Sequence, residues 1–392
     1  MKAIHRVVGV ALASAAAPSV AENMPAPAPM APAVTVEGRA VFDVMTVPTD
    51  ATRSVQALAE GEIRIEADLD RIVHLRGLRA GMRILGTAGG HPNDLVATMQ
   101  GVDNIEVGDH RLKLYEFWIQ QAIAADRGSV RLGLTDLNAE FYANDAAGLL
   151  VAPPFGIGSE LAATGPNGPS IFPSTALTAR LDLRVGATGY FRAAAVDAKA
   201  GVLGDQSGID FSMRDGALLI AEAGSIRRGK LAFGYWRYTR RQGDIRDGST
   251  ARLAAQGAYV LGEYPLTGSR GSAKGIDLFA RIGMSDGRTT PYRGGFQFGL
   301  LARGLMPARP AAQFSAGMHA GFLSRGYRQN LRDGGDDAGN AEVGVEITCQ
   351  DRIGRFLTVQ PDLQYVRRPV SGEADKGVLI FGVRLIVEGG AG

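Results

Sequence analysis

The sequence predicts an all-β protein, namely a transmembrane antiparallel β-barrel of about 16 strands. Three observations support this fold class. Segments of about 9–11 residues with strand-like alternation recur through most of the chain, and that length suits a tilted strand crossing a bilayer. Glycine supplies 53 of the 392 residues without a collagen-like triplet, which suits many tight turns. An export signal precedes the first strand.

The N-terminus predicts export from the cytoplasm. A short basic region, the apolar run "VVGVALASAAA" and small residues at the cleavage positions form a secretory signal over residues 1–21, cut after Ala21. Residues 22–36 are rich in Pro and Ala and predict an extended leader. Residues 37–392 then form the barrel domain. No later run approaches 18 apolar residues, so a membrane form of this chain would cross with strands.

Strand-like segments follow one another along the barrel domain. Uneven gaps between them alternate roughly between short and long, as short periplasmic turns and long outer loops would. "DG" pairs between several segments favour tight turns. The predicted strands are residues 38–46, 62–69, 81–88, 111–121, 129–137, 177–185, 189–198, 216–224, 230–239, 252–264, 275–284, 294–304, 312–323, 341–350, 355–366 and 377–387.

The stretch "DNIEVGDHRLKLYEFWIQQ", residues 103–121, changes the parity of its apolar positions. Apolar residues occupy even positions up to Leu114 and odd positions from Phe117. A β-bulge, which adds one residue to a strand, explains such a change. We then expect Phe117 to face lipid, while Glu116 and Trp118 face the lumen. The alternative places Tyr115 and Trp118 in an aromatic girdle at the membrane interface.

The segment 177–185, "LTARLDLRV", alternates without interruption. Arg180, Asp182 and Arg184 share one face, and leucine, alanine and valine occupy the other. An arginine on the lipid face near the bilayer midplane would cost about 2–4 kcal/mol. The three charged residues are therefore predicted to face the lumen.

Composition and motifs argue against several function classes. The 42 basic and 40 acidic residues nearly balance, so no nucleic-acid partner is indicated. The histidines have no metal-ligand spacing, no cofactor motif occurs, and the single cysteine, Cys349, is expected to pack as a small apolar residue. Asp136 and Glu140 are better explained by a turn and a pore-mouth carboxylate than by a glycosidase pair. The sequence therefore predicts no enzyme.

Several linked motifs resemble one protein family. They are "GGHPNDLVATMQGVDNIEVGDHRLKLYEFWIQQAIAADRGSVRLGLTDLNAEF" at 89–141, "YFRAAAVDAKAG" at 190–201, "LTVQPDLQYVRRP" at 357–369, and "VLIFGVRLIV" near the end. In this order they resemble the carbohydrate-selective porins of the OprB type. The resemblance implies an outer-membrane porin for passive diffusion of small sugars, embedded in outer-membrane lipid, with homo-oligomers possible. Porins of this kind often end on an aromatic residue, whereas this chain ends "VRLIVEGGAG".

Alternation along the strands gives a set of pore-lining candidates. Their side chains offer hydrogen-bond donors, acceptors and an aromatic face to sugar hydroxyls. For each, the other interpretation is a wall residue that only stabilises the barrel. The alternative function is an exported all-β carbohydrate-binding protein, a lectin or adhesin, with its apolar face packed inward. The candidates are Glu116, Trp118, Arg131, Arg180, Asp182, Arg184, Arg281, Glu346, Gln360, Gln364 and Arg384.

Overall fold

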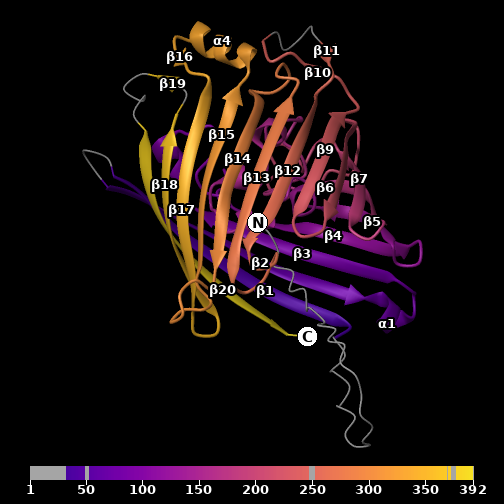
Figure 1. Ribbon diagram of the computed structural model, residues 1–392. Helices are drawn as coiled ribbons and strands as arrows, with labels where there is room; N and C mark the ends of the chain where they lie inside the picture. Colours follow the sequence, from indigo (N-terminus) through magenta and orange to yellow (C-terminus); the bar gives the residue numbers. More distant parts are fainter. Residues whose placement is uncertain (1–31, 49–52, 247–251, 369, 372–376, 392) are drawn as a thin grey trace, which may run out of the picture.

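The computed structural model describes residues 32–48, 53–246, 252–368, 370–371 and 377–391. It is a closed barrel whose wall strands form one continuous antiparallel sheet (Figure 1). The predicted signal peptide, residues 1–21, and most of the predicted leader lie outside the described residues. The first strand begins at Val34, just before the predicted start of the barrel domain.

Each wall strand pairs with its neighbours in chain order, and β1 pairs with β20 to close the barrel. Two short pairs, β10 (Gln242–Gly243) with β11 (Arg252–Leu253) and β16 (Asp337–Ala338) with β19 (Val370–Ser371), lie above the wall (Figure 1). The wall strands are β1 (Val34–Pro48), β2 (Arg53–Asp68), β3 (Leu78–Gly89), β4 (Arg111–Ile123), β5 (Gly128–Thr135), β6 (Ala176–Val185), β7 (Gly189–Asp197), β8 (Ala217–Ile226), β9 (Lys230–Tyr238), β12 (Gln256–Thr267), β13 (Gly275–Ser285), β14 (Tyr292–Arg303), β15 (Gln313–Leu323), β17 (Ala341–Ile353), β18 (Leu357–Arg367) and β20 (Val378–Ala391).

Every predicted strand overlaps one wall strand, so the predicted count and fold class are confirmed. The largest difference in boundary concerns β2, which begins at Arg53 rather than at residue 62. Its first half is built of small and polar residues with weak alternation, yet it pairs with β1 from Pro48–Arg53 to Val34–Ala67. Pairing across a hairpin, which local alternation does not reveal, extends this strand.

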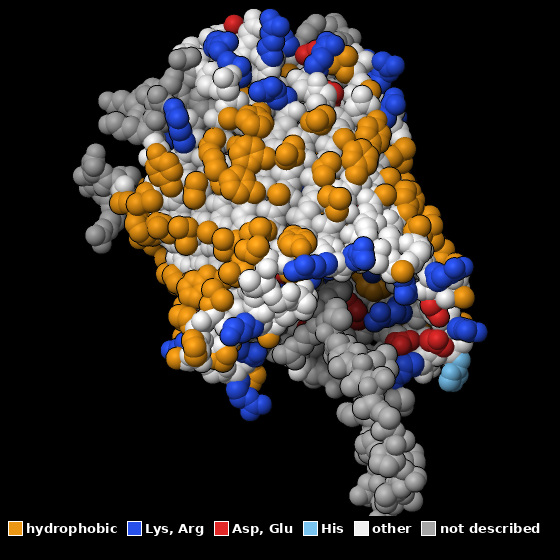
Figure 2. Space-filling view, viewed as in Figure 1, with side chains coloured by type: hydrophobic (Ala, Val, Ile, Leu, Met, Phe, Trp, Pro, Cys, Tyr) orange, Lys and Arg blue, Asp and Glu red, His pale blue; other side chains and the backbone are white. Residues whose placement is uncertain are grey.

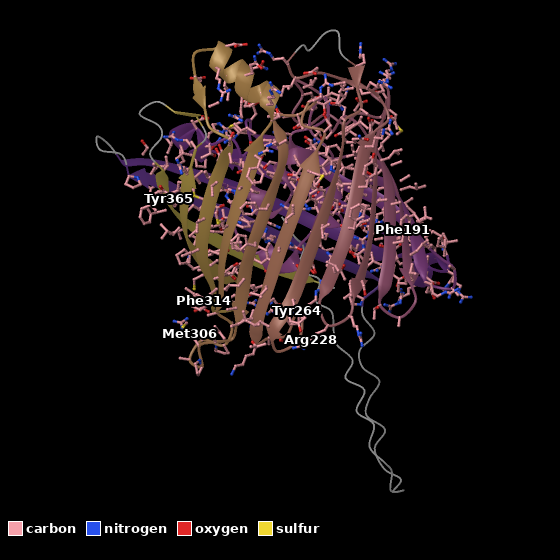
Figure 3. All side chains as sticks on the ribbon, turned by 45° about the horizontal axis from the view of Figure 1, so that its top comes forward. Phe191, Arg228, Tyr264, Met306, Phe314 and Tyr365 are labelled. Atoms are coloured by element: carbon pink, nitrogen blue, oxygen red, sulfur yellow. The ribbon has the colours of Figure 1, made fainter. Side chains whose placement is uncertain are left out.

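Apolar side chains cover the outside of the barrel. Phe42 on β1, Phe233 on β9 and Ile282 on β13 are 47%, 55% and 64% exposed. Figure 2 shows a band of hydrophobic side chains across the wall, with Lys and Arg side chains above and below it. Phe191 on β7 and Tyr365 on β18 also lie on the outside (Figure 3). This is the polarity of a wall that meets lipid, opposite to that of a soluble sandwich.

The predicted bulge is present in β4. Arg83 on β3 pairs with Glu116 and the next residue, Ile84, pairs with Leu114, so Tyr115 is the additional residue. Phe117 is half exposed on the outer side, whereas Tyr115 is buried. Leu112 and Ile119, on opposite sides of the bulge, consequently both face outward.

The connections differ between the two ends of the barrel. One end carries tight turns such as those at 124–127, 186–188, 227–229 and 354–356, together with the end of β20. The other end carries long connections, one of which contains α4 (Arg325–Asp333), drawn at the top of Figure 1. Short turns are periplasmic in barrels of this architecture. In the described ranges no helix is long and apolar enough to span a bilayer.

Candidate functional site

A segment between β5 and β6, residues 136–175, lies inside the barrel, and we call it the constriction segment. It contains η1 (Leu137–Ala139), η2 (Asp145–Ala147), η3 (Pro153–Phe155) and α3 (Ser159–Ala162). Its apolar side chains pack on lumen-facing residues of the wall. One cluster joins Phe141 and Leu161 to Trp236 and Tyr238, and another joins Phe155 to Phe279. On this side the lumen face of the wall therefore carries large apolar side chains beside its polar ones, which strand alternation alone did not predict.

Polar wall side chains hold the constriction segment by its backbone. Arg281 donates to three of its carbonyl groups, at 2.6, 3.0 and 3.1 Å. Glu346 accepts from two consecutive backbone N–H groups, and Gln360 donates to a further carbonyl at 2.7 Å. All three wall residues are at most 3% exposed. A buried backbone group without a partner costs free energy, so these contacts fix the path of the segment.

A second segment, residues 91–110 between β3 and β4, also enters the barrel and begins with α2 (Pro92–Val96). Glu342 accepts from two of its consecutive backbone N–H groups, at 2.7 and 2.8 Å. Gln364 donates to one of its carbonyls at 2.9 Å. Arg384 binds Asp43 on β1 at 2.6 Å and Asp103 in the segment at 3.3 Å. Burial raises the pKa of Asp103, and the nearby Asp43 carboxylate raises it further.

A set of charged side chains remains partly exposed where the constriction segment faces β5, β6 and β7. Glu140 of the segment lies 3.0 Å from Arg131, 2.8 Å from Arg180 and 3.7 Å from Arg192. Arg192 also binds Asp182 at 2.7 Å. We call these five residues the Glu140 cluster. Three guanidinium groups and two carboxylates leave one net positive charge.

Exposure separates the Glu140 cluster from the buried wall residues. The side chains of Glu140, Arg131, Arg192 and Asp182 are 19–23% exposed, whereas that of Arg180 is 7% exposed. Water inside the barrel can therefore reach the first four. Fork-shaped donors beside carboxylate acceptors match the hydroxyl groups of a polar solute.

Trp118 packs against Arg131 of the Glu140 cluster. The Arg131 guanidinium carbon lies 4.1 Å from the Trp118 ring centroid, a cation–π contact. Gly81 is opposite Trp118 in β3, and a Cβ atom there would lie 2.3 Å from the indole ring. The glycine thus lets the indole lie flat against the wall. Arg131 also donates to Gln120 at 2.9 Å, which fixes its guanidinium plane.

A neighbouring ion-pair group lies on β2, β3 and β4. Arg83 pairs with Glu62 and lies 3.7 Å from Glu116. Glu116 also accepts from the Asp136 backbone N–H at 3.1 Å, which ties the start of the constriction segment to β4. Asp136 caps η1, as a turn residue does.

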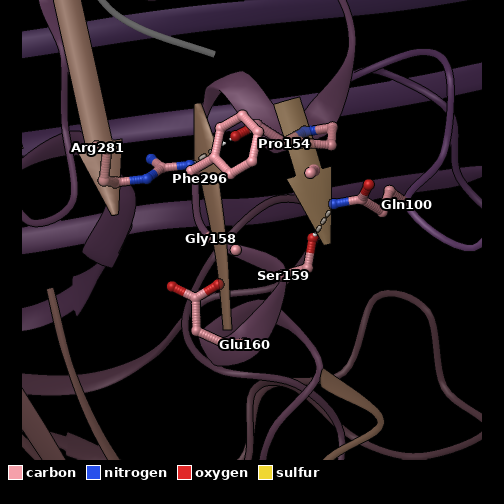
Figure 4. Close-up of a pocket in the computed structure, with 9 residues that line it drawn as sticks. Gln100, Pro154, Gly158, Ser159, Glu160, Arg281 and Phe296 are labelled. Carbon is pink, nitrogen blue, oxygen red and sulfur yellow. Dashed lines mark hydrogen bonds between the residues drawn. The ribbon is translucent and has the colours of Figure 1, made fainter. Parts of the chain in front are cut away.

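The constriction segment packs closely against the wall strands β13–β15. A cavity of about 10 Å³ remains there, lined by Gln100, Ser159, Glu160 and Arg281 among others (Figure 4). Gln100 donates to Ser159 at 2.6 Å across it. This volume admits roughly one water molecule. This cavity is therefore too small to hold a sugar.

The structure divides the predicted pore-lining residues into groups. Trp118, Arg131, Arg180 and Asp182 meet at the Glu140 cluster. Glu116 belongs to the neighbouring ion-pair group, and Arg184 lies exposed at the short-turn end, where it donates to the Asp126 carbonyl at 2.6 Å. The predicted residues with buried contacts to the inserted segments or their anchors are Arg281, Glu346, Gln360, Gln364 and Arg384.

Sequence reasoning missed Arg192 and did not place Glu140 among arginines. Arg192 stands alone among alanines in its strand, so alternation gave it no weight. Glu140 lies in a connection, where periodicity carries no information. In the part of the chain that the structure describes, no group of three or more His, Cys, Asp or Glu side chains is arranged to hold a metal.

The architecture and the site define a class of protein. A closed 16-stranded antiparallel barrel, apolar outside and charged inside, with a segment folded into its lumen, is an outer-membrane porin. A soluble lectin would have required the apolar face to pack inward. Comparison identifies the family: the model of the carbohydrate-selective porin, OprB family, matches residues 52–388, and the chain belongs to this family.

Individual relatives agree with this assignment. Porin B of Pseudomonas aeruginosa is 24% identical over 183 residues, a match that covers 40% of this chain and 40% of that protein. The high-pH structure of Pseudomonas putida OprB superposes with a TM-score of 0.80 at 19% identity, over 91% of this chain and 94% of that chain. The outer membrane channel DcaP of Acinetobacter baumannii gives 0.54 at 13% identity, over 91% and 96%. At these identities the structures show a shared fold.

Proposed function

We propose that this chain is an outer-membrane channel through which small carbohydrates diffuse passively, and that they contact the wall at the Glu140 cluster. One observation carries the proposal. Where the constriction segment faces β5, β6 and β7, the side chains of four charged residues remain 19–23% exposed inside the barrel. They offer donors and acceptors at the place where the passage is narrowed by the inserted segment.

The chemistry of the cluster suits an uncharged solute with many hydroxyl groups. The guanidinium groups of Arg131 and Arg192 donate in fixed planes, and Glu140 and Asp182 accept. Each can exchange a water molecule for a sugar hydroxyl. Because the charges are already paired with one another at 2.7–3.7 Å, no single contact to a sugar is strong. Weak, multiple contacts are what allow a solute to enter and also to leave.

Five of the remaining predicted residues receive a supporting role in this proposal. Arg281, Glu346 and Gln360 hold the constriction segment, and Gln364 and Arg384 hold the 91–110 segment. Both segments are fixed by wall residues on several strands. Because the two segments are held in place, the passage keeps the same width over time. A passage that does not open and close supports diffusion without energy coupling.

Planar-bilayer recording with graded sugars tests the proposal. Purified protein should open stepwise channels whose current falls as a small sugar is added to the bath. Arg131→Ala should weaken this block about fivefold, which corresponds to about 1 kcal/mol for one charged hydrogen bond. Arg79→Ala is the matched control, because Arg79 is 55% exposed near the short-turn end and pairs with Glu66 at 3.6 Å.

Two results would contradict the proposal. A protein that stays in solution without detergent and opens no channels is not a porin. Channels whose sugar block is the same in the Arg131→Ala variant and in the wild type would place the solute path away from the Glu140 cluster.

A further inference from the structure

An aromatic patch lies on the outer side of the wall near the long-loop end. Phe296 and Phe298 on β14 stack with ring centroids 5.9 Å apart and an interplanar angle of 19°. Phe322 on β15 packs on Phe296, also at 5.9 Å. Phe298 is half exposed. Phe298 lies near the middle of β14 and Phe322 near the end of β15, so the patch extends from the long-loop end toward the middle of the wall.

Two exposed arginines lie at this end of the wall, and one of them, Arg293, contacts the patch. The Arg293 guanidinium carbon is 5.5 Å from the Phe322 ring centroid. Arg325 is the first residue of α4, and the Ser324 N–H just before it donates to the Pro291 carbonyl at 2.7 Å, so α4 begins beside the start of β14. Within the described ranges, neither arginine has a carboxylate at ion-pair distance. Figure 2 shows Lys and Arg side chains gathered along this end of the wall, above the hydrophobic band.

Nearby acidic side chains of this end are engaged elsewhere. Asp244 binds Arg288 at 2.7 Å. The Asp286 carboxylate accepts from backbone N–H groups of its own turn at 2.8 Å. Asp333, at the far end of α4, pairs with Arg246. The positive charge of Arg293 and Arg325 is therefore left available to an anion from outside the protein.

We propose that Arg293, Arg325 and the aromatic patch form a binding site for the phosphate-bearing headgroup of an outer-leaflet lipid. The guanidinium groups would bind phosphate oxygens, for which their fork geometry is suited. The acyl chains would lie against Phe296, Phe298 and Phe322. A lipid fits better than a soluble phosphate, because the apolar half of the site is continuous with the charged half and faces the bilayer.

Thermal unfolding of the whole protein in detergent micelles tests this site. The probe is phosphatidic acid, and diacylglycerol with the same acyl chains supplies the apolar part without the phosphate. Phosphatidic acid should raise the unfolding temperature of the wild type, and diacylglycerol should not. In the Arg293→Ala/Arg325→Ala double variant, the apparent affinity for phosphatidic acid should fall about tenfold or more.

Arg228→Ala is the matched control. Arg228 lies over Tyr264, 5.1 Å from its ring centroid, at the opposite, short-turn end (Figure 3). Arg228 and Tyr264 present an arginine beside an aromatic ring to the other leaflet. Removing the Arg228 side chain should leave phosphatidic acid binding unchanged. An equal loss in this variant and in the double variant would reduce the effect to general basic charge and overturn the proposal.

Two further outcomes would also overturn the proposal. One is that diacylglycerol stabilises the protein as much as phosphatidic acid does. The other is that inorganic phosphate does so, because the ligand would then be a free anion. If the alanine pair does not assemble, an Arg293→Lys/Arg325→Lys variant tests the same point. Lysine keeps the charge and loses the fork, so we expect about threefold weaker binding, and wild-type binding would refute recognition by the guanidinium planes.

Discussion

Replacing Glu140 by glutamine should make the channel more selective for anions. The substitution keeps the shape of the side chain and removes one negative charge from a site where Glu140 lies 2.8–3.7 Å from three guanidinium groups. The net charge of the Glu140 cluster then rises from one positive charge to two. Assembly should be unaffected, because Glu140 is 19% exposed and takes part in none of the contacts that hold the constriction segment at β13, β17 and β18.

The magnitude follows from Coulomb's law. An ion passing about 5 Å from the removed charge interacts with it by about 0.8 kcal/mol in water. With a Debye length of about 10 Å at 0.1 M salt, about 0.5 kcal/mol remains. The change favours anions and disfavours cations by equal amounts, so the two add to about 1 kcal/mol. The chloride-to-potassium permeability ratio should therefore rise about fivefold.

Reversal potentials across a planar bilayer under a potassium chloride gradient measure this ratio. Asp333→Asn is the control, because it removes the same charge from the end of α4, where Asp333 pairs with Arg246. An unchanged ratio in normally conducting Glu140→Gln channels would mean that ions do not pass the cluster. An equal change in both variants would assign the effect to the overall charge of the protein.

Three further predictions follow from the same geometry. Arg180→Ala should assemble and alter sugar flux in liposome swelling, whereas Leu181→Arg, on the lipid face, should cost about 2–4 kcal/mol and deplete the folded, heat-modifiable band on gels. Glu346→Leu leaves two buried N–H groups without an acceptor, at about 1–3 kcal/mol each, and should speed proteolysis of the constriction segment. Burial raises the pKa of Glu106 from 4.5 to about 7, so the stability it gives the 91–110 segment is full below pH 4.5 and lost as the pH rises through 7. After discounting for solvent screening, this stabilisation is about 1 kcal/mol. Hydrogen exchange corrected for intrinsic rates should show the pH dependence in the wild type and not in Glu106→Gln.

The strand positions could be predicted because the membrane imposes a local pattern on the sequence. Each outward residue of a wall strand meets lipid and each inward residue does not. Apolar residues therefore recur at every second position within each strand. The bulge at Tyr115 was predictable for the same reason, since one extra residue reverses the parity of all that follow. The lumen-facing assignment of Arg180 and Asp182 also needed nothing beyond their own strand.

The partners of the inward residues could not be predicted in this way. Glu346 accepts from a backbone group 195 residues away, and Arg384 binds Asp43 at a separation of 341 residues. Alternation predicts only that these side chains point inward. Whether an inward side chain meets water, a solute or an inserted segment depends on the path of a connection without periodicity. Solvent-exposed and buried wall residues therefore look alike in the sequence.

The lumen-facing residues of the wall nonetheless explain which side of the barrel the constriction segment packs on. On β9 and β12 the inward side chains include Trp236, Tyr259 and Leu261, each at most 2% exposed. Left in a water-filled lumen, side chains of this size would each forgo about 1.5–3 kcal/mol of burial. The constriction segment packs on these side chains and therefore lies on that side of the barrel. The inward charges of β5–β7 need no apolar cover, so water stays beside them. We therefore expect the passage to follow the wall strands whose inward residues are charged, and substituting those residues by leucine should close it rather than widen it.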